Sequence, residues 1–132
     1  MLGAIAGGAG KETLNILSNI SDMVGIAYQL KDDLDDYYEK QKDITTRKFS
    51  FLLSLLFENI SPQLKKKIFS DLKNGNSDTV IQVIDRQKIP GKSEDLVKQY
   101  VKKVQNSVNT ITILELKLAL YEVLGKIFSK YL

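Results

Sequence analysis

A long stretch of the chain repeats apolar residues at intervals of three and four. Between about Glu12 and about Lys40 these positions are Leu14, Leu17, Ile20, Val24, Ala27, Leu30, Leu34 and Tyr37. Such spacing gathers apolar side chains on one face of a helix with 3.6 residues per turn. The pattern predicts one long amphipathic helix, preceded by a small, glycine-rich segment at residues 2–10.

The next apolar segment has no clear alternation. Residues 41–47 are polar and are expected to form a loop, whereas 48–59 predicts a largely buried helix. A continuous apolar run is also compatible with a strand. Ser61 and Pro62 then favour a helix start, because a hydroxyl caps free amides and proline suits the first helical position. That helix is expected to end at residues 74–76, which read Asn-Gly-Asn.

Local signals divide the remaining residues into three further helices. One is expected to start at Ser77 and Asp78 and to stop near residues 89–91, Ile-Pro-Gly. Ser93 is expected to cap the next helix, and Thr112 with Glu115 resembles a capping box for the last one. Residues 108–113 are rich in β-branched side chains, which favour a strand locally. They have no partner strand, so we expect a break between helices and an all-α fold.

Composition narrows the chemistry that the 132 residues can perform. There is no Cys and no His, so a metal would need oxygen ligands, which suits magnesium, manganese or calcium. Serine–histidine and cysteine–histidine catalysis are excluded within this sequence. The formal net charge of +3 comes from interspersed acids and bases, which does not favour nucleic acid as a partner. We expect no transmembrane segment, no signal peptide and a cytoplasmic protein, because the apolar runs are short.

The segment GIAYQLKDDLDDYYE, residues 25–39, carries the candidate chemistry. On a helix, four of its residues share one face, with Asp33 at the edge of that face. These four are Gly25, Gln29, Asp32 and Asp36. The opposite face would hold Ile26, Ala27, Leu30, Leu34 and Tyr37.

Clustered carboxylates repel one another unless a cation compensates their charge. Magnesium prefers hard oxygen ligands and retains waters, which leaves positions for phosphate oxygens. We therefore expect Asp32, Asp33 and Asp36 to point inward from one helix and to hold a diphosphate through Mg²⁺. The competing interpretation is a solvated acidic helix face, which is common.

These residues resemble a known family. GIAYQLKDDLDD resembles the second aspartate-rich motif of trans-prenyl diphosphate synthases, Gly-x-Ala-Phe-Gln-x-x-Asp-Asp-x-x-Asp. LGAIAGGAG resembles the family's small-residue helix, and KDITTRKFSFLLSLL is similar to its Asp-Ile and Gly-Lys-x-Thr segment with the apolar helix that follows. LKLALYEVLGKIFSKYL resembles the closing helix. The resemblance runs from about Leu2 to about Glu58 and returns near the C-terminus.

The resemblance implies that residues 1–132 are the C-terminal half of a class I isoprenoid synthase, a helical bundle. It implies Asp32 as the best magnesium ligand, with Asp33 and Asp36 acting directly or through metal-bound water. Lys48 would contact an allylic diphosphate, and Tyr28 and Gln29 would line the site. The implied reaction is chain elongation of an allylic diphosphate by isopentenyl diphosphate.

Departures from the family pattern leave alternatives open. The motif Asp-Asp-x-x-Asp occurs once, Arg47 replaces a glycine and Ser50 replaces a threonine. We therefore expect a fragment that is inactive alone and that forms a homo-oligomer or associates with the missing N-terminal half. The alternatives are a peptide-modifying prenyltransferase similar to those acting on competence pheromones, and a non-catalytic helical subunit or interaction module.

Overall fold

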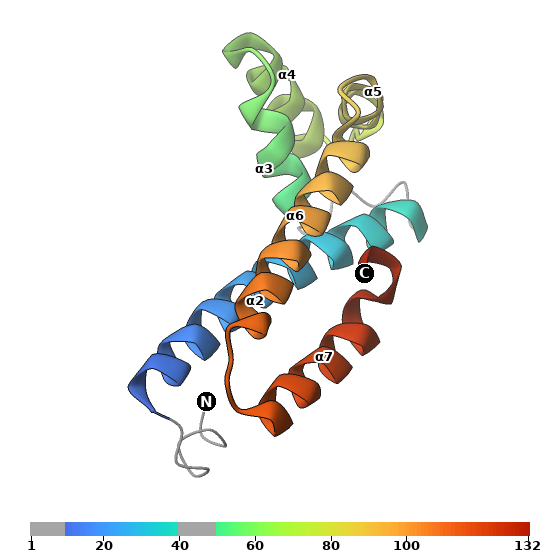
Figure 1. Cartoon of the computed structure of the whole chain (residues 1–132). Helices are drawn as coiled ribbons and strands as arrows, with labels where there is room; N and C mark the ends of the chain where they lie inside the picture. The colour runs from blue at the N-terminus through green and yellow to red at the C-terminus, as the bar shows by residue number, and fades with distance from the viewer. Residues whose placement is uncertain (1–9, 40–49) are drawn as a thin grey trace. The chain divides into compact units, whose positions relative to one another are not determined.

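Helices make up all the regular structure in the part of the chain that can be described. The computed structural model describes residues 10–39 and 50–132, and every element in these ranges is helical (Figure 1). This confirms the predicted all-α fold class. In chain order the elements are α2 (Lys11–Glu39), α3 (Ser50–Glu58), α4 (Pro62–Lys73), α5 (Asp78–Arg86), α6 (Ile89–Asn109), α7 (Leu114–Phe128) and the 3-10 turn η2 (Ser129–Tyr131).

The described residues belong to two compact units. The first takes in those within 1–28 and 97–132, and the second takes in those within 29–96. Buried apolar residues of the first unit are Leu17, Ile20, Ala27, Val97, Val101, Val104, Val108, Ile111, Leu124 and Phe128. Buried apolar residues of the second are Leu30, Leu34, Tyr37, Leu52, Leu56, Ile68, Val80, Val83, Ile84 and Ile89. The predicted stripe of α2 is therefore buried at most of its positions.

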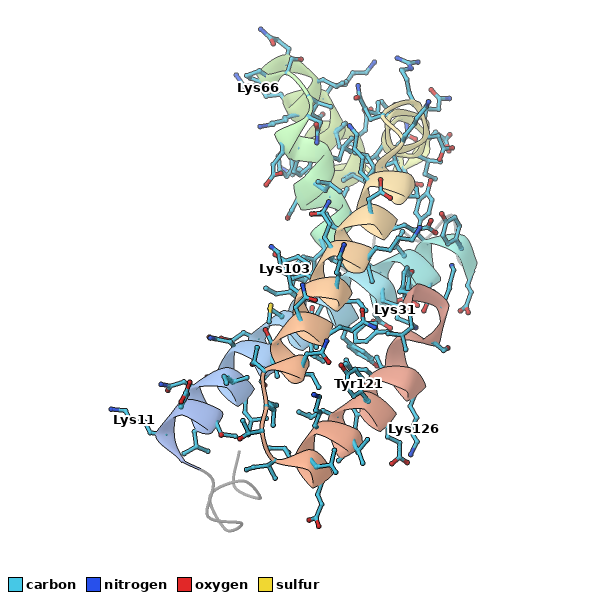
Figure 2. All side chains as sticks on the ribbon, in the orientation of Figure 1. Lys11, Lys31, Lys66, Lys103, Tyr121 and Lys126 are labelled. Atoms are coloured by element: carbon cyan, nitrogen blue, oxygen red, sulfur yellow. The ribbon has the colours of Figure 1, made fainter. Side chains whose placement is uncertain are left out.

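In the first unit, α6 and α7 are joined by a hydrogen bond near the end of α6. The hydroxyl of Tyr121, which is labelled on α7 in Figure 2, donates to the side-chain oxygen of Asn109. The ammonium of Lys117 donates to the backbone carbonyl of Asn109 at 3.3 Å. One residue at the end of α6 therefore receives two polar contacts from α7.

In the second unit, α3 and α4 form the helices that the sequence predicted. The ambiguous apolar run at 48–59 contains helix α3 and no strand in its described part, 50–59. The rings of Phe57 on α3 and Phe69 on α4 lie 5.0 Å apart between centroids. Ser61 caps α4 by accepting the Leu64 amide at 3.3 Å, and Gly75 supplies the turn after the helix with a φ of 76°. A glycine is favoured there because a side chain strains this left-handed conformation.

At the start of α5, the Asp78 amide donates to the side chain of Asn76 at 3.1 Å, and Ser77 makes no side-chain cap.

The join between α5 and α6 differs from the predicted one. The break falls at residues 87–88, where Lys88 has a φ of 54°, rather than at 89–91. Pro90 lies in the first turn of α6, where an absent N–H breaks no helical bond. The prediction that Ser93 caps a helix is wrong, because it is a buried interior residue of α6.

The join between α6 and α7 confirms the predicted break but shortens it. Val108 is still helical and fully buried, so the non-helical residues are 110–113. Thr110 closes α6 by donating its hydroxyl to the Ser107 carbonyl at 2.6 Å. The predicted capping box is wrong, because Ile113 occupies the cap position of α7 and makes no side-chain cap bond.

A search of the described residues for membrane spans gives none, because no helix there combines sufficient length with sufficient apolar character.

The Ser61 cap gives a direct test of the α4 boundary. Replacing Ser61 with Ala removes the acceptor for the Leu64 amide and is expected to lower the free energy of unfolding by about 1 kcal/mol. Urea denaturation followed by circular dichroism measures this change. Ser70→Ala, at an exposed interior position of the same helix, is the matched control and is expected to change stability by less than about 0.5 kcal/mol. Equal losses in the two variants would contradict the cap.

Candidate functional site

The acidic turn of α2, residues 29–39, has the two faces that its spacing predicts. Ala27, Leu30, Leu34 and Tyr37 are buried, whereas Gly25, Gln29 and Asp32 are exposed and Asp36 is half-buried. Ile26 departs from the prediction because it is 37% exposed. The helical period therefore sorts most of the motif into an inner and an outer side.

The outer side presents Asp32 and Asp36, four residues apart. Residues at this spacing are neighbours on a helix surface. Neither carboxylate makes an ion pair or hydrogen bond with another described residue. Among the described residues no group of three or more acidic side chains is arranged to hold a metal by itself. The pair instead suits a hydrated hard cation, which takes one or two carboxylates and fills its remaining positions with water and phosphate oxygens.

Asp33 lies on the inner side and already has a partner. Its side chain is buried, with 6% exposure, and its Oδ2 accepts the backbone N–H of Phe51 at 2.8 Å. Phe51 is the second residue of α3, so its amide is one of those that a helix leaves without an internal acceptor. Asp33 therefore caps α3 from another helix, which the sequence did not reveal.

Opposing effects act on the charge of Asp33. Burial is the largest and raises the pKa of its carboxyl group above the usual range. The backbone amides of Phe51 and Leu52 act against this by stabilising the charged form, and the nearby charges of Asp32 and Asp36 raise the pKa further. The net direction is upward, so desolvation and like charges outweigh the two amides.

Asp35, the fourth carboxylate of the turn, is paired within α2. Its Oδ2 lies 2.7 Å from the ammonium of Lys31, which is labelled in Figure 2. The two residues are four positions apart, which is the spacing that brings helix side chains together. This pair offsets one of the negative charges of the turn within the helix itself.

Two tyrosines connect the end of α2 to other helices of the second unit. The hydroxyl of buried Tyr37 donates to Asp85 Oδ1 of α5 at 2.8 Å. The hydroxyl of Tyr38 donates to Glu94 Oε1 of α6 at 3.4 Å. Burial and then the Asp85 contact raise the pKa of Tyr37, because both disfavour its ionised form. Sequence patterns predicted a buried Tyr37 but gave no sign of these polar partners.

The remaining predicted site residues are placed unevenly. Tyr28 is 51% exposed, and Gln29 is also exposed. Gln29 lies three residues before Asp32, on the outer side of the helix. Lys48 lies outside the described residues. The structure therefore brings Gln29, Asp32 and Asp36 to the outer side of the helix. The expectation that all three aspartates point inward is wrong for Asp32, which is exposed, and holds fully for Asp33 alone.

Comparison with known proteins gives a family match. The family model described as polyprenyl synthetase matches residues 1–89. The match contains the whole acidic turn and extends through α3, α4 and α5, although residues 61–89 carry no motif that the sequence analysis identified. The chain matches no curated protein and no solved structure in the searches made.

The Tyr37–Asp85 hydrogen bond predicts a pH-dependent contribution to stability. Replacing Tyr37 with Phe is expected to lower the free energy of unfolding by about 1 kcal/mol at pH 7, since a hydrogen bond is lost. The folded-state pKa of Tyr37 is raised above its unfolded value of about 10. The contribution is therefore fully present below about pH 10 and is lost as the pH rises above it.

Urea unfolding of wild type and Tyr37→Phe at pH 7, 10 and 11 measures this dependence. The stability gap between the two proteins is expected to narrow as the pH rises above 10. Tyr28→Phe changes an exposed ring and controls for the loss of a hydroxyl; it should match wild type at pH 7. A gap that stays constant from pH 7 to 11 would show that Tyr37 ionisation is not linked to folding.

Proposed function

Because the chain belongs to the polyprenyl synthetase family, we propose that it is part of a prenyltransferase and that its α2 helix binds isoprenoid diphosphates through magnesium. The family match supports a prenyl-transfer function in general. The substrate, the reaction and the role of each residue are our proposal.

The observation that carries the proposal is the sorting of the four aspartates at residues 32–36 of α2. Asp33 is engaged by the Phe51 amide and Asp35 by the Lys31 ammonium. Asp32 and Asp36 remain on the outer side, adjacent on the helix and without a partner among the described residues. A solvated acidic face needs no such separation, whereas a cation site needs carboxylates that are not already neutralised.

Magnesium fits this pair of donors. Mg²⁺ is held in proteins by one or two carboxylates together with waters and substrate phosphates, and an all-protein cage is uncommon. When bound, it would supply Lewis-acid and electrostatic stabilisation of a departing diphosphate. Asp32 is the principal proposed ligand, and Asp36 would act directly or through metal-bound water. Asp33 adds negative charge to the same turn.

The other residues of the proposed site would contact the substrate. The Gln29 side-chain amide, on the same outer side, would donate to a phosphate oxygen. Tyr28 is proposed to line the site, and Lys48 is proposed to pair with the allylic diphosphate through its positive charge. In the proposed reaction the allylic carbon–oxygen bond breaks, which releases diphosphate and leaves an allylic carbocation. The double bond of isopentenyl diphosphate then attacks this carbocation. A proton is then lost from the adduct.

We propose that a second acidic helix completes the site, because Asp32 and Asp36 supply only two carboxylates for magnesium. The motif Asp-Asp-x-x-Asp occurs once in the sequence. We propose that these residues supply one half of the site and that association with the other half, or oligomerisation, completes it.

Prenyl transfer by these 132 residues alone is therefore expected to be undetectable. The measurement is incorporation of radiolabelled isopentenyl diphosphate into extractable product with an allylic diphosphate and Mg²⁺. Turnover above the level of an Asp32→Asn, Asp36→Asn double variant would contradict the need for a second half.

Diphosphate binding through magnesium is testable without turnover. Mg²⁺ with methylenediphosphonate is expected to shift the backbone amides of residues 29–36 in nuclear magnetic resonance spectra. Asp32→Asn should weaken the apparent affinity by about tenfold, which corresponds to about 1.4 kcal/mol for one lost ligand. Asp35→Asn removes the same charge from the same turn and is expected to weaken binding by no more than about threefold, because Asp35 is already paired.

The Asp35→Asn control shows whether a loss of affinity is specific to Asp32. Equal effects of Asp32→Asn and Asp35→Asn would indicate a general charge effect and contradict a specific ligand. If Mg²⁺ and methylenediphosphonate leave the amides of wild type unchanged, a non-catalytic helical module becomes the better interpretation.

A further inference from the structure

We infer that Asp33 is a positioning residue that fixes α3 and the acidic turn to each other, and that it does not bind magnesium. This inference rests on the proposed function for its catalytic meaning. Its structural part, a cap supplied by one helix to another, follows from a contact within the second unit alone.

The helical register separates Asp33 from the proposed ligands. Asp33 lies three residues after Leu30 and four before Tyr37, so it continues the stripe of buried side chains. Asp32 and Asp36 follow the outer stripe, which Asp33 borders. Its 6% exposure agrees with this placement, whereas Asp32, the preceding residue, is exposed. Asp33 therefore faces the helices of the second unit and not the side on which a hydrated cation would approach.

The contact itself has the properties of a helix cap. Asp33 Oδ2 lies 2.8 Å from the Phe51 amide nitrogen, a normal length for a charge-assisted hydrogen bond. The Leu52 amide also stabilises the carboxylate. Both amides belong to the first turn of α3, where N–H groups lack helical acceptors and where the helix dipole favours negative charge. The Phe51 amide engages Asp33 Oδ2, so a cation approaching this oxygen would compete with the amide.

The consequence for the site is orientation of the outer carboxylates. Contacts between a helix's inner side chains and neighbouring helices restrict its rotation about its axis. Asp33 fixes the inner side to α3, and Tyr37 fixes it to Asp85 of α5 one turn later. Because Asp32 immediately precedes Asp33, a fixed Asp33 sets the direction in which Asp32 projects. Side chains held by such contacts are what a metal site needs for a defined geometry.

Three variants separate positioning from ligation. Asp33→Asn keeps an acceptor oxygen for the Phe51 amide but loses the charge, Asp33→Ala loses both, and Asp32→Asn removes a proposed ligand without touching the cap. The first readout is hydrogen exchange of the Phe51 and Leu52 amides. Exchange of these amides is expected to rise at least tenfold in Asp33→Ala, by much less in Asp33→Asn, and not at all in Asp32→Asn.

The second readout is the apparent Mg²⁺ affinity in the presence of methylenediphosphonate. Asp33→Asn is expected to weaken it by no more than about threefold, the same as the charge control Asp35→Asn, whereas Asp32→Asn weakens it about tenfold. If Asp33 were a metal ligand, Asp33→Asn would weaken the Mg²⁺ affinity as much as Asp32→Asn does, and asparagine at position 33 would not preserve it. If Asp33→Ala does not fold, Asp33→Asn alone still makes the comparison with Asp32→Asn.

Each result has a definite meaning. Asp33→Asn losing Mg²⁺ affinity as severely as Asp32→Asn, with Phe51 exchange unchanged, would overturn the inference and make Asp33 a ligand. Unchanged Phe51 and Leu52 exchange in Asp33→Ala would overturn the cap. If wild type gives no response to Mg²⁺ and methylenediphosphonate, the proposed function fails, and the exchange rates still decide whether Asp33 caps α3.

Discussion

A buried carboxylate facing the start of another helix is the interaction on which the acidic turn depends. Asp33 brings a charge into a setting where burial and two neighbouring aspartates disfavour it, and the amides of Phe51 and Leu52 offset part of that cost. Such a group is tolerated only when tertiary structure supplies its partners. The local order of α2 and α3 is therefore tied to a polar contact as well as to the apolar cores around Leu34 and Leu52.

The contact between Asp33 and the Phe51 amide also changes the interpretation of the four aspartates at residues 32–36. Five residues containing four aspartates would repel one another on an isolated helix. In the folded chain two of the four are compensated by different means, Asp33 by backbone amides and Asp35 by Lys31. Asp32 and Asp36 have no such partner among the described residues, and each also repels Asp33. A divalent cation would relieve this repulsion on the side of the helix that is open to a ligand, so the sorting favours binding chemistry over a purely solvated face.

The sequence predicted what depends on local pattern. The stripe of α2, the Ser61 cap and the Gly75 turn all follow from neighbours within four residues, and the structure confirms them. The prediction that Ser93 caps a helix also relied on a local signal, its hydroxyl group. It is wrong because Ser93 is buried in the interior of α6. The partner of Asp33 lies 18 residues away and that of Tyr37 lies 48 away, so no spacing rule on one helix could name them. The helical period could have placed Asp33 among the buried residues of α2. The resemblance of the motif to a set of metal ligands instead favoured its assignment as a ligand.

The family match covers both ends of the two contacts that hold the inner side of the acidic turn. It ends at residue 89, so it includes α3, which receives the Asp33 cap, and Asp85 of α5, which receives the Tyr37 hydroxyl. It does not include Glu94, the acceptor for Tyr38, whose hydrogen bond is also the longest of the three at 3.4 Å. The two shorter contacts therefore fall in the matched region, and they are the ones made by buried residues of α2. An outer pair of carboxylates would bind a cation in a defined geometry only if contacts of this kind hold the helix that carries them.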